Sequence, residues 1–286
     1  MSAIFGPAGN AENFPHKSSA QAPGWLRQLG LDCYEYQCGK GVHVGEDTAR
    51  KVGQAAREAG IALSLHAPYF INLANPDPAA LDKTIGYITG ACLVADQMGA
   101  KRVVIHSGAL MKRTRREALD TALASLKQVI RACDEAGFGH LTLCPETMGK
   151  LGQLGDLDEV LELCRVDPRL IPCVDFGHLY ARTLGELDGG AAMEGILDKL
   201  ERALGEERAS RFHSHFSHIE FTPNGGEKCH RTFADDGGYG PAWEPLAAAV
   251  ARRGWSPTFI CESAGTQAED ALEMKRVYQS CLEGMT

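Results

Sequence analysis

The chain has 286 residues, 44% hydrophobic and 23% charged, and this ordinary globular composition excludes a disordered or fibrous protein. Its formal net charge of -8 argues against nucleic-acid binding through overall charge, although it is compatible with a local basic groove. The sequence contains no apolar stretch of roughly 20 residues and no secretory signal pattern, so we expect a cytoplasmic protein without membrane contact.

Short β-like runs alternate with helical segments along most of the chain. The runs that predict strands are 3–6, 33–38, 61–66, 102–107, 140–146, 170–176, 211–217 and 258–263. Helical spacing of apolar residues is clearest at 79–98, 115–136, 157–165, 191–204, 242–252 and 268–282. We expect left-handed helix ends at Gly60, Gly99, Gly137 and Gly254. Eight such units favour an α/β protein with a single (β/α)8 TIM-barrel domain over residues 1–286.

One long glycine-rich stretch follows the seventh predicted strand. It covers residues 222–241 and reads TPNGGEKCHRTFADDGGYGP. A stretch of this length inside a compact domain is more often functional than a linker, so we predict an extended functional loop.

Imidazoles and carboxylates stand at or just after the ends of the predicted strands, where a TIM barrel forms its active site. They are His66, His106, Glu146, Asp175, His178, His215, His230 and Glu262. Side chains of this kind converging on one rim leave unpaired charge unless a divalent cation neutralises them. Donors without thiolates favour zinc, manganese, iron or nickel, and a carboxylate shared by two ions allows a cluster. We therefore predict a metal site at the C-terminal face of the strands.

Two further histidines flank His215 in the segment FHSHFSHIEF. Strand alternation places His213 on the same side as His215 but one layer deeper, and His218 beyond the strand end. Neither is counted among the predicted ligands.

The segments around these residues resemble the endonuclease IV family of apurinic/apyrimidinic endonucleases, within the xylose isomerase-like barrels. The matching segments are LHAPYFINLANP, VIHSGA, CPET, CVDFGHLYA, HFS and CES. The resemblance implies that the eight strand-end residues bind two or three Zn²⁺ ions, with Mn²⁺ or Fe²⁺ as alternatives. It implies that Glu146 is the bridging carboxylate and that Glu146 and Glu262 are catalytic. The implied reaction is hydrolysis of the phosphodiester 5′ to an abasic site in damaged duplex DNA, and no protein partner is evident.

The same resemblance implies four substrate contacts. Tyr69 is expected to enter the DNA at the abasic site, and Asn72 to hydrogen-bond backbone or phosphate. Arg113, within the basic segment MKRTRR, and Lys228 are expected to contact phosphate. The alternatives are that Tyr69 and Phe70 cap the barrel as apolar groups, and that MKRTRR is the solvated start of a helix.

The chain departs from the family pattern at two places. Lys228 stands where the family carries the aspartate of an Asp-x-His pair that binds a third zinc, while His230 is retained. Glu227 can replace that aspartate, or the site holds two ions and Lys228 contacts phosphate. The loop QCGKGVH lacks the arginine that the family uses beside its tyrosine, and Lys40 is the candidate to replace it.

Two other functions remain open from the sequence. A divalent-metal sugar isomerase or epimerase on the same barrel is favoured by the acidic charge and by the absent arginine, but it needs fewer ligands. A metal-binding barrel without catalysis needs the ligands alone. The sequence does not determine the metal, the number of ions, the substrate or the oligomeric state.

Overall fold

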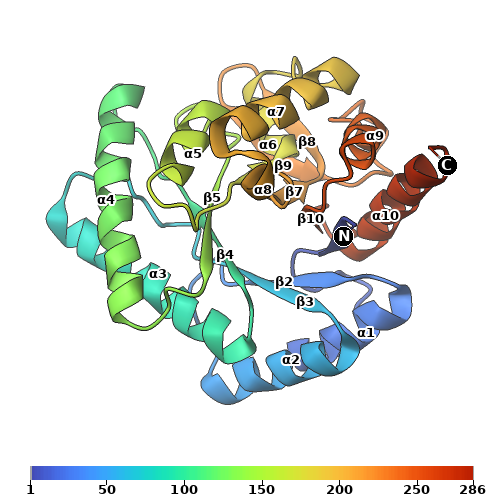
Figure 1. Ribbon diagram of the computed structural model, residues 1–286, viewed down its shortest axis with the longest axis horizontal. Helices are drawn as coiled ribbons and strands as arrows, with labels where there is room; N and C mark the ends of the chain where they lie inside the picture. The colour runs from blue at the N-terminus through green and yellow to red at the C-terminus, as the bar shows by residue number, and fades with distance from the viewer. Residues whose placement is uncertain (1, 286) are drawn as a thin grey trace.

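The computed structural model describes residues 2–285 and contains eight parallel strands that form a nearly closed barrel (Figure 1). The strands are β1 (Ile4–Pro7), β2 (Cys33–Gln37), β3 (Ala62–His66), β4 (Arg102–His106), β5 (Thr142–Glu146), β6 (Cys173–Asp175), β7 (His213–Phe216) and β10 (Thr258–Cys261). Their order in the sheet is β1-β10-β7-β6-β5-β4-β3-β2. The predicted TIM barrel is confirmed, and each of its eight strands lies within a predicted run or overlaps it.

The sheet closes between β1 and β2 through a short contact. The N–H of Gly9 donates to the carbonyl of Glu35 at 2.9 Å, beside an isolated parallel bridge between Ala8 and Glu35. Gly6 permits this closure, because a Cβ atom there would lie 1.8 Å from the carbonyl oxygen of Cys33. Glu35 therefore sits where the first and last parts of the sheet meet.

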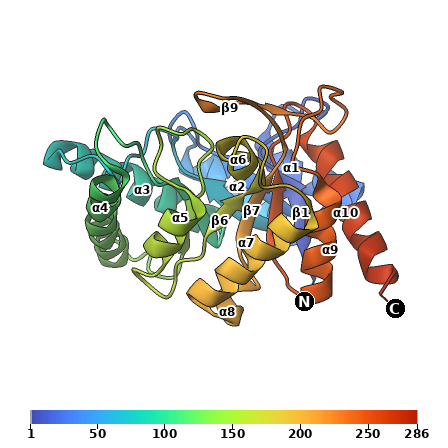
Figure 2. The same cartoon turned by 90° about the horizontal axis from the view of Figure 1, so that it is seen from above.

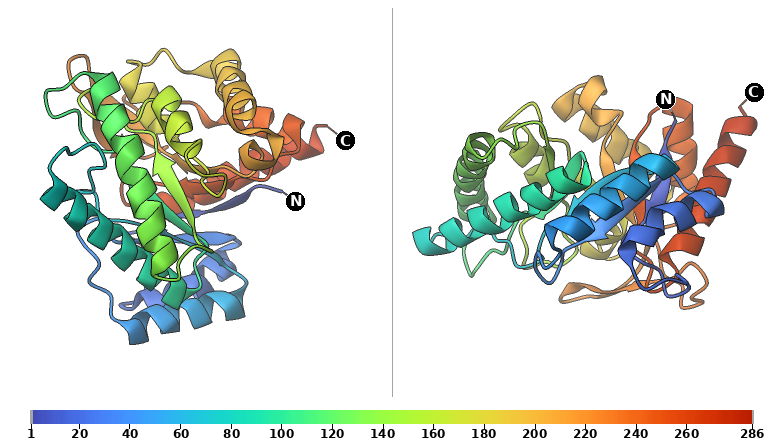
Figure 3. Two further views of the ribbon diagram at one scale, coloured as in Figure 1. Left: turned by 60° about the vertical axis from the view of Figure 1, so that its left-hand side comes forward. Right: turned by 90° about the horizontal axis from the view of Figure 1, so that it is seen from below.

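Helices cover the outside of the barrel (Figures 1 and 3). They are α1 (Ala22–Leu29), α2 (Glu46–Ala59), α3 (Pro78–Met98), α4 (Arg115–Glu135), α5 (Leu157–Cys164), α6 (Phe176–Arg182), α7 (Gly189–Leu204), α8 (Glu206–Ala209), α9 (Trp243–Arg253) and α10 (Gln267–Glu283), with a short 3-10 turn at Ser19–Gln21. All six predicted helices are present. None of the helices within residues 2–285 has both the length and the apolar character needed to cross a membrane.

Four glycines behave nearly as the sequence predicts. Gly60, Gly99 and Gly254 are the left-handed residues that end α2, α3 and α9, with φ values of 66°, 74° and 64°. Gly137 is also left-handed, with φ 86°, but α4 ends one residue earlier at a right-handed Ala136. These turns return the chain to the start of the next strand.

The predicted loop after the seventh strand is in part an antiparallel hairpin, which corrects the prediction for residues 222–231. Its strands are β8 (His218–Thr222) and β9 (Gly226–Arg231). The Asn-Gly-Gly sequence at 224–226 supplies the tight turn, and Gly226 has a φ of 74°. Figure 2 shows β9 at the end of the molecule opposite both chain termini. The hairpin thus lies over the carboxyl ends of the barrel strands.

Candidate metal centre

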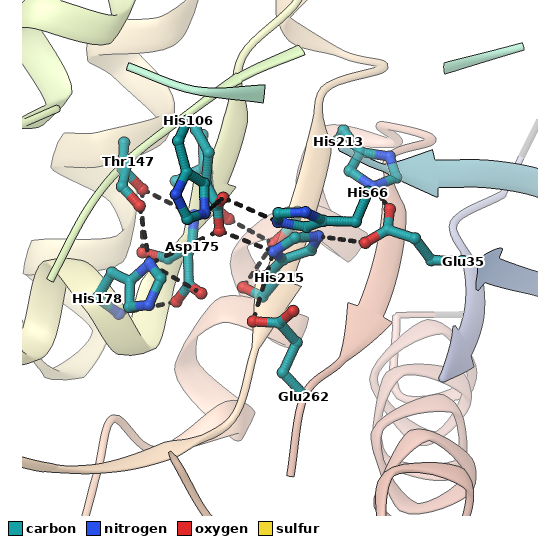
Figure 4. Close-up of polar contacts among 12 residues, drawn as sticks. Glu35, His66, His106, Thr147, Asp175, His178, His213, His215 and Glu262 are labelled. Atoms are coloured by element: carbon teal, nitrogen blue, oxygen red, sulfur yellow. Dashed lines mark hydrogen bonds and ion pairs between the residues drawn. The ribbon is translucent and has the colours of Figure 1, made fainter. Parts of the chain in front are cut away.

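The eight predicted metal-binding residues lie together at the carboxyl ends of the strands (Figure 4). Glu146, at the end of β5, is the centre of the group and is 1% exposed. Its Oε2 lies 3.3 Å from His66 Nε2 and 3.2 Å from His106 Nε2. Its Oε1 lies 2.9 Å from His215 Nδ1. One carboxylate therefore faces donors from three other strands, as a residue shared by two ions must.

A second set of donors lies on the Oε1 side of Glu146. It joins Glu146 to Asp175, His215 and Glu262, whose ligand atoms all lie within 4.8 Å of one another. Asp175 caps the start of α6, because its Oδ1 accepts the N–H of His178 at 2.7 Å. Its Oδ2 is buried and has no hydrogen-bond partner among the described residues. A buried carboxylate oxygen without a donor fits a position beside a cation.

A third set consists of His178, Glu227 and His230, again within 4.8 Å. Glu227 Oε2 lies 3.4 Å from His178 Nε2. The hairpin makes this possible through a register shift: Glu220 pairs with Cys229 but Phe221 pairs with Glu227, so Lys228 is an extra, bulged residue. Strand alternation would otherwise send Glu227 and His230, three residues apart, to opposite faces. Glu227 therefore occupies the place that the sequence pattern left without an aspartate.

Three of the imidazoles have their protons fixed by backbone carbonyl groups. The Nδ1 hydrogen bonds run from His66 to Ala67 (2.7 Å), from His106 to Tyr69 (3.1 Å) and from His178 to Thr147 (2.8 Å). Because a carbonyl only accepts, Nδ1 carries the hydrogen in each ring and a neutral ring turns its Nε2 lone pair toward the carboxylates. Lone pairs and carboxylate oxygens at these distances repel unless a cation or added protons lie between them, so the donor set fits divalent ions.

The charges and the burial of the centre shift the pKa values of two of its side chains upward. Burial lowers the pKa of His178, but the charges of Asp175, Glu227 and Glu146 outweigh burial and raise this pKa to about 9. Burial raises the pKa of Glu262. The site is thus rich in negative charge that attracts cations.

A pocket of about 410 Å³ opens onto the donors, and Tyr69 stands at its edge. The Tyr69 ring stacks on His106 at a centroid distance of 5.5 Å and is half exposed. It also lies against Gly39, where a Cβ atom would come within 2.1 Å of the ring. An aromatic side chain at this edge can meet either a flat ligand or solvent.

The side chains of the other three residues predicted to contact substrate already bond to groups of the protein. Asn72 Oδ1 accepts the N–H groups of Ala74 and Ala109, at 3.1 and 3.0 Å. Arg113 donates to the carbonyl of Ala74, and Lys228 pairs with Glu220 on the outside of the hairpin. Substrate binding by Asn72, Arg113 and Lys228 stays a prediction, and each has a structural role besides.

Two side chains in the pocket were not predicted from the sequence. Lys150 and Gln153, in the loop after β5, line the pocket beside Glu146. Lys150 is the only lysine or arginine among the described residues that line it, and no described side chain pairs with its ammonium group. Gln153 Oε1 is buried without a hydrogen-bond partner within residues 2–285. Their position after a strand carried a signal, but isolated polar residues in a glycine-rich loop have no distinguishing pattern.

Glu35 is a further residue that sequence reasoning missed. It lies in the middle of β2, is fully buried, and places Oε1 2.9 Å from His215 Nε2. The signal was a carboxylate inside the strand-like run CYEYQC, two residues before Gln37 and therefore on the same face.

Comparison with known sequences identifies one family. The profile of the xylose isomerase-like TIM barrel family matches residues 23–279. An uncharacterized protein of Methanocaldococcus jannaschii is 32% identical over 275 residues, which cover 95% of this chain and 96% of that protein. A probable endonuclease 4 of Mycoplasma pneumoniae is 33% identical over 121 residues, and this match spans 41% of each chain.

Solved structures resemble the barrel at lower identity. Endonuclease IV from Thermus thermophilus superposes with a TM-score of 0.68 at 20% identity, covering 98% of this chain and 99% of that one. A D-tagatose 3-epimerase-like protein gives a TM-score of 0.69 at 18% identity, covering 89% and 91%. At such identities the likeness concerns the fold, and a nuclease and a sugar enzyme resemble it equally well.

Proposed function

This chain belongs to the xylose isomerase-like TIM barrel family, and from that premise we propose that it is a metal-dependent hydrolase of the endonuclease IV type. In this proposal one barrel domain, residues 1–286, cleaves the phosphodiester 5′ to an abasic site in damaged duplex DNA. Its cofactors are three divalent ions, with Zn²⁺ preferred over Mn²⁺ or Fe²⁺ because imidazole supplies most of the donors. A reaction on DNA assigns the protein to the cytoplasm.

The number of donors is the observation that carries the proposal. Nine imidazole and carboxylate side chains lie in three neighbouring sets, two of which share Glu146 and His215. A single tetrahedral ion takes four ligands, so nine donors exceed what a one-ion enzyme needs. The likeness of part of the chain to a probable endonuclease 4 supports the same class of reaction.

The residues divide the work of hydrolysis in the following way. When bound, the ions supply Lewis-acid activation of water and of the phosphate. Glu146 would be a ligand of two ions, since its two oxygens face different imidazoles. Glu262 Oε2, 3.5 Å from His215 Nδ1 and lining the pocket, is placed to accept the proton of the attacking water.

In this proposal, residues at the edge of the pocket recognise the abasic nucleotide. An abasic nucleotide has no base to unstack, so turning it into the pocket costs less than flipping a paired base. Tyr69 is positioned to fill the space beside it, and Lys150 Nζ to contact the phosphate.

A divalent-metal sugar isomerase or epimerase is the second candidate. One observation favours it: two arginines of the basic segment MKRTRR already pair with carboxylates of the protein. Arg115 donates to Glu159 at 2.7 Å and Arg116 to Glu162 at 3.1 Å, so a DNA phosphate would have to compete with these carboxylates. Together with the net charge of -8, this leaves few cations on the rim.

The two functions are separated by one experiment. Zinc-loaded protein is incubated with a duplex that carries one synthetic abasic site, with an intact duplex and a chelator-treated sample alongside, and products are resolved on a denaturing gel. Metal-dependent nicking 5′ to the abasic site is the expected result. The proposal fails if fully loaded protein leaves the abasic duplex intact, and epimerisation of ketohexoses by the same sample would then support the second candidate.

A further inference from the structure

A buried carboxylate lies one layer below the metal centre. Glu35 is 0% exposed, and Figure 4 shows it between the imidazoles of His213 and His215. Its Oε1 lies 2.9 Å from His215 Nε2, and its Oε2 lies 2.8 Å from His213 Nε2. Ser64 Oγ donates to Oε2 at 2.8 Å and Gln37 Nε2 donates to Oε1 at 3.2 Å. Four groups therefore surround one carboxylate that no solvent reaches.

The hydrogen positions in this cluster follow from Arg102. A guanidinium nitrogen only donates, and Arg102 Nη1 lies 3.3 Å from His213 Nδ1. Nδ1 of His213 is therefore the acceptor, and its Nε2 carries the hydrogen that is donated to Glu35. The guanidinium is itself fixed by Thr258 Oγ1 at 2.9 Å and by the carbonyl of Arg211 at 3.0 Å. Burial lowers the pKa of His213 to about 4, which agrees with a neutral ring.

With these hydrogens assigned, Glu35 accepts and His215 Nε2 donates. The free lone pair of His215 is then on Nδ1, which faces Glu146 Oε1 at 2.9 Å and Glu262 Oε2 at 3.5 Å. Resting on the metal centre of the proposed function, we propose that Glu35 is the positioning residue of His215: it fixes the ring and selects Nδ1 as its metal-binding nitrogen.

His215 differs in this respect from the other imidazoles of the centre. The outward nitrogens of His66, His106 and His178 meet backbone carbonyls, and that of His230 meets the hydroxyl of Ser217. The Nδ1 atom of His178 also lies 3.2 Å from Asp175 Oδ2, but Asp175 is itself a predicted ligand. Among the imidazoles of the centre within residues 2–285, only His215 bonds to a carboxylate outside the predicted ligand set. A carboxylate partner makes an imidazole a stronger donor to a metal and fixes its orientation.

The rival explanation is a further metal ion in the same cluster. Ligand atoms of Cys173, His213 and His215 lie within 4.8 Å of one another. An ion on His213 Nε2 would move the ring hydrogen to Nδ1, against the guanidinium of Arg102, and would place two cations side by side. Burial raises the pKa of the Cys173 thiol well above its usual value, which opposes formation of the thiolate that a metal ion binds. We therefore assign the cluster to the positioning of His215 and not to the binding of a further ion.

The first test is metal affinity. Glu35→Gln keeps the size of the side chain but removes its charge and turns an amide N–H₂ toward donors. We expect zinc at the Glu146–His215–Glu262 set to bind roughly 10- to 100-fold more weakly, as measured by competition with a chromophoric chelator. Glu159→Gln is the matched control: Glu159 is also buried and paired, but its partner is Arg115 and it contacts none of the predicted ligands. It is expected to lower stability without changing zinc affinity.

The second test does not depend on a variant. Long-range ¹H–¹⁵N spectra of zinc-loaded wild-type protein report which nitrogen of each histidine binds metal. We expect Nδ1 coordination for His215 and Nε2 coordination for His66, His106 and His178. Coordination of His215 through Nε2, unchanged zinc affinity in Glu35→Gln, or four zinc ions per chain would each overturn the proposal. Neither test uses DNA, so a protein that passes both and leaves abasic DNA intact contradicts the proposed function alone.

Discussion

Glu227 carries the prediction for the number of bound ions. It is the only carboxylate within 4.8 Å of both His178 and His230 among the described residues. We expect Glu227→Gln to reduce bound zinc by one equivalent and to leave the other two, because the sets around Glu146 are untouched. Elemental analysis of the purified protein measures this directly. Glu220→Gln on the outside of the same hairpin is the control and should keep all the zinc; full retention in Glu227→Gln would show that the third set holds no ion.

Lys150 carries the corresponding prediction for the substrate. Lys150 is the one lysine or arginine that lines the pocket, within the described part of the chain, and its ammonium group has no protein partner there. A hydrogen bond from a charged donor is worth about 1.5–3 kcal/mol, so Lys150→Ala should lower kcat/KM for abasic DNA by roughly 10- to 100-fold. Zinc content should be unchanged. Lys112→Ala, an exposed lysine outside the pocket, is the control, and equal rates for the two variants would remove Lys150 from the site.

At the residue scale the sequence indicated the candidate ligands more clearly than it indicated the residues that support them. His66, His106 and Glu146 end apolar runs, where position in a barrel gives each residue its meaning. Glu35 is different, because it ends no run and its role depends on His213 and Arg102, which are distant in sequence. The proton arrangement that gives Glu35 its role is a property of packed neighbours and not of a motif.

At the scale of an element, the hairpin β8–β9 was likewise indicated only in part by the sequence. Apolar and polar residues alternate in β8 over only five residues, and β9 is polar, so the strand signal was short, although the Asn-Gly-Gly turn was present. The bulge at Lys228 was invisible from sequence, since it is defined by pairing with Glu220 and Phe221. Without the bulge, the replacement of aspartate by lysine would mean the loss of a ligand.

Helices α2 and α6 were also missed, each for a physical reason. The inner face of α2 is built from small residues, Ala49, Val52, Gly53 and Ala56, which give a weak apolar stripe. They are small because α2 packs closely on α3: a Cβ atom on Gly53 would lie 2.2 Å from the carbonyl oxygen of Met98. Helix α6 has only seven residues and begins directly after Asp175, so its signal merged with the end of β6.

The bulge itself can be tested by deletion. Removing Lys228 restores regular alternation in β9 and turns Glu227 away from the face that holds His230. We expect the deletion variant to lose one zinc equivalent, as Glu227→Gln does. Lys228→Ala keeps the chain length and therefore the bulge, and it should keep the zinc. Retention of all the zinc by a folded deletion variant would mean that the bulge does not set the direction of Glu227.

For the whole molecule, the buried charges of the candidate metal centre lower the stability of the folded state, and bound ions would offset this effect. The barrel brings Glu146, Asp175 and His215 together with almost no exposure to water, and Asp175 Oδ2 accepts no hydrogen bond from the described residues. Buried charges of this kind oppose folding unless they are paired. The donors come from five strands, helix α6, the residue after β10 and the hairpin, and they meet only when the barrel is closed. Ions would therefore bind the folded state in preference to the unfolded one.

Chelation should therefore lower the stability of the entire protein. Ions held at about 1,000 times their Kd add ~4 kcal/mol to the free energy of unfolding, which corresponds to roughly 10 °C in Tm for a chain of this size. Differential scanning calorimetry before and after dialysis against a chelator measures the change, and added Zn²⁺ should restore the original Tm. Mg²⁺ is the control, since it prefers octahedral oxygen ligands and should restore little. An equal Tm for the zinc-loaded and metal-free proteins would mean that the donors are satisfied without ions, and the hydrogen bonds around Glu146 would then have to hold the barrel rim by themselves.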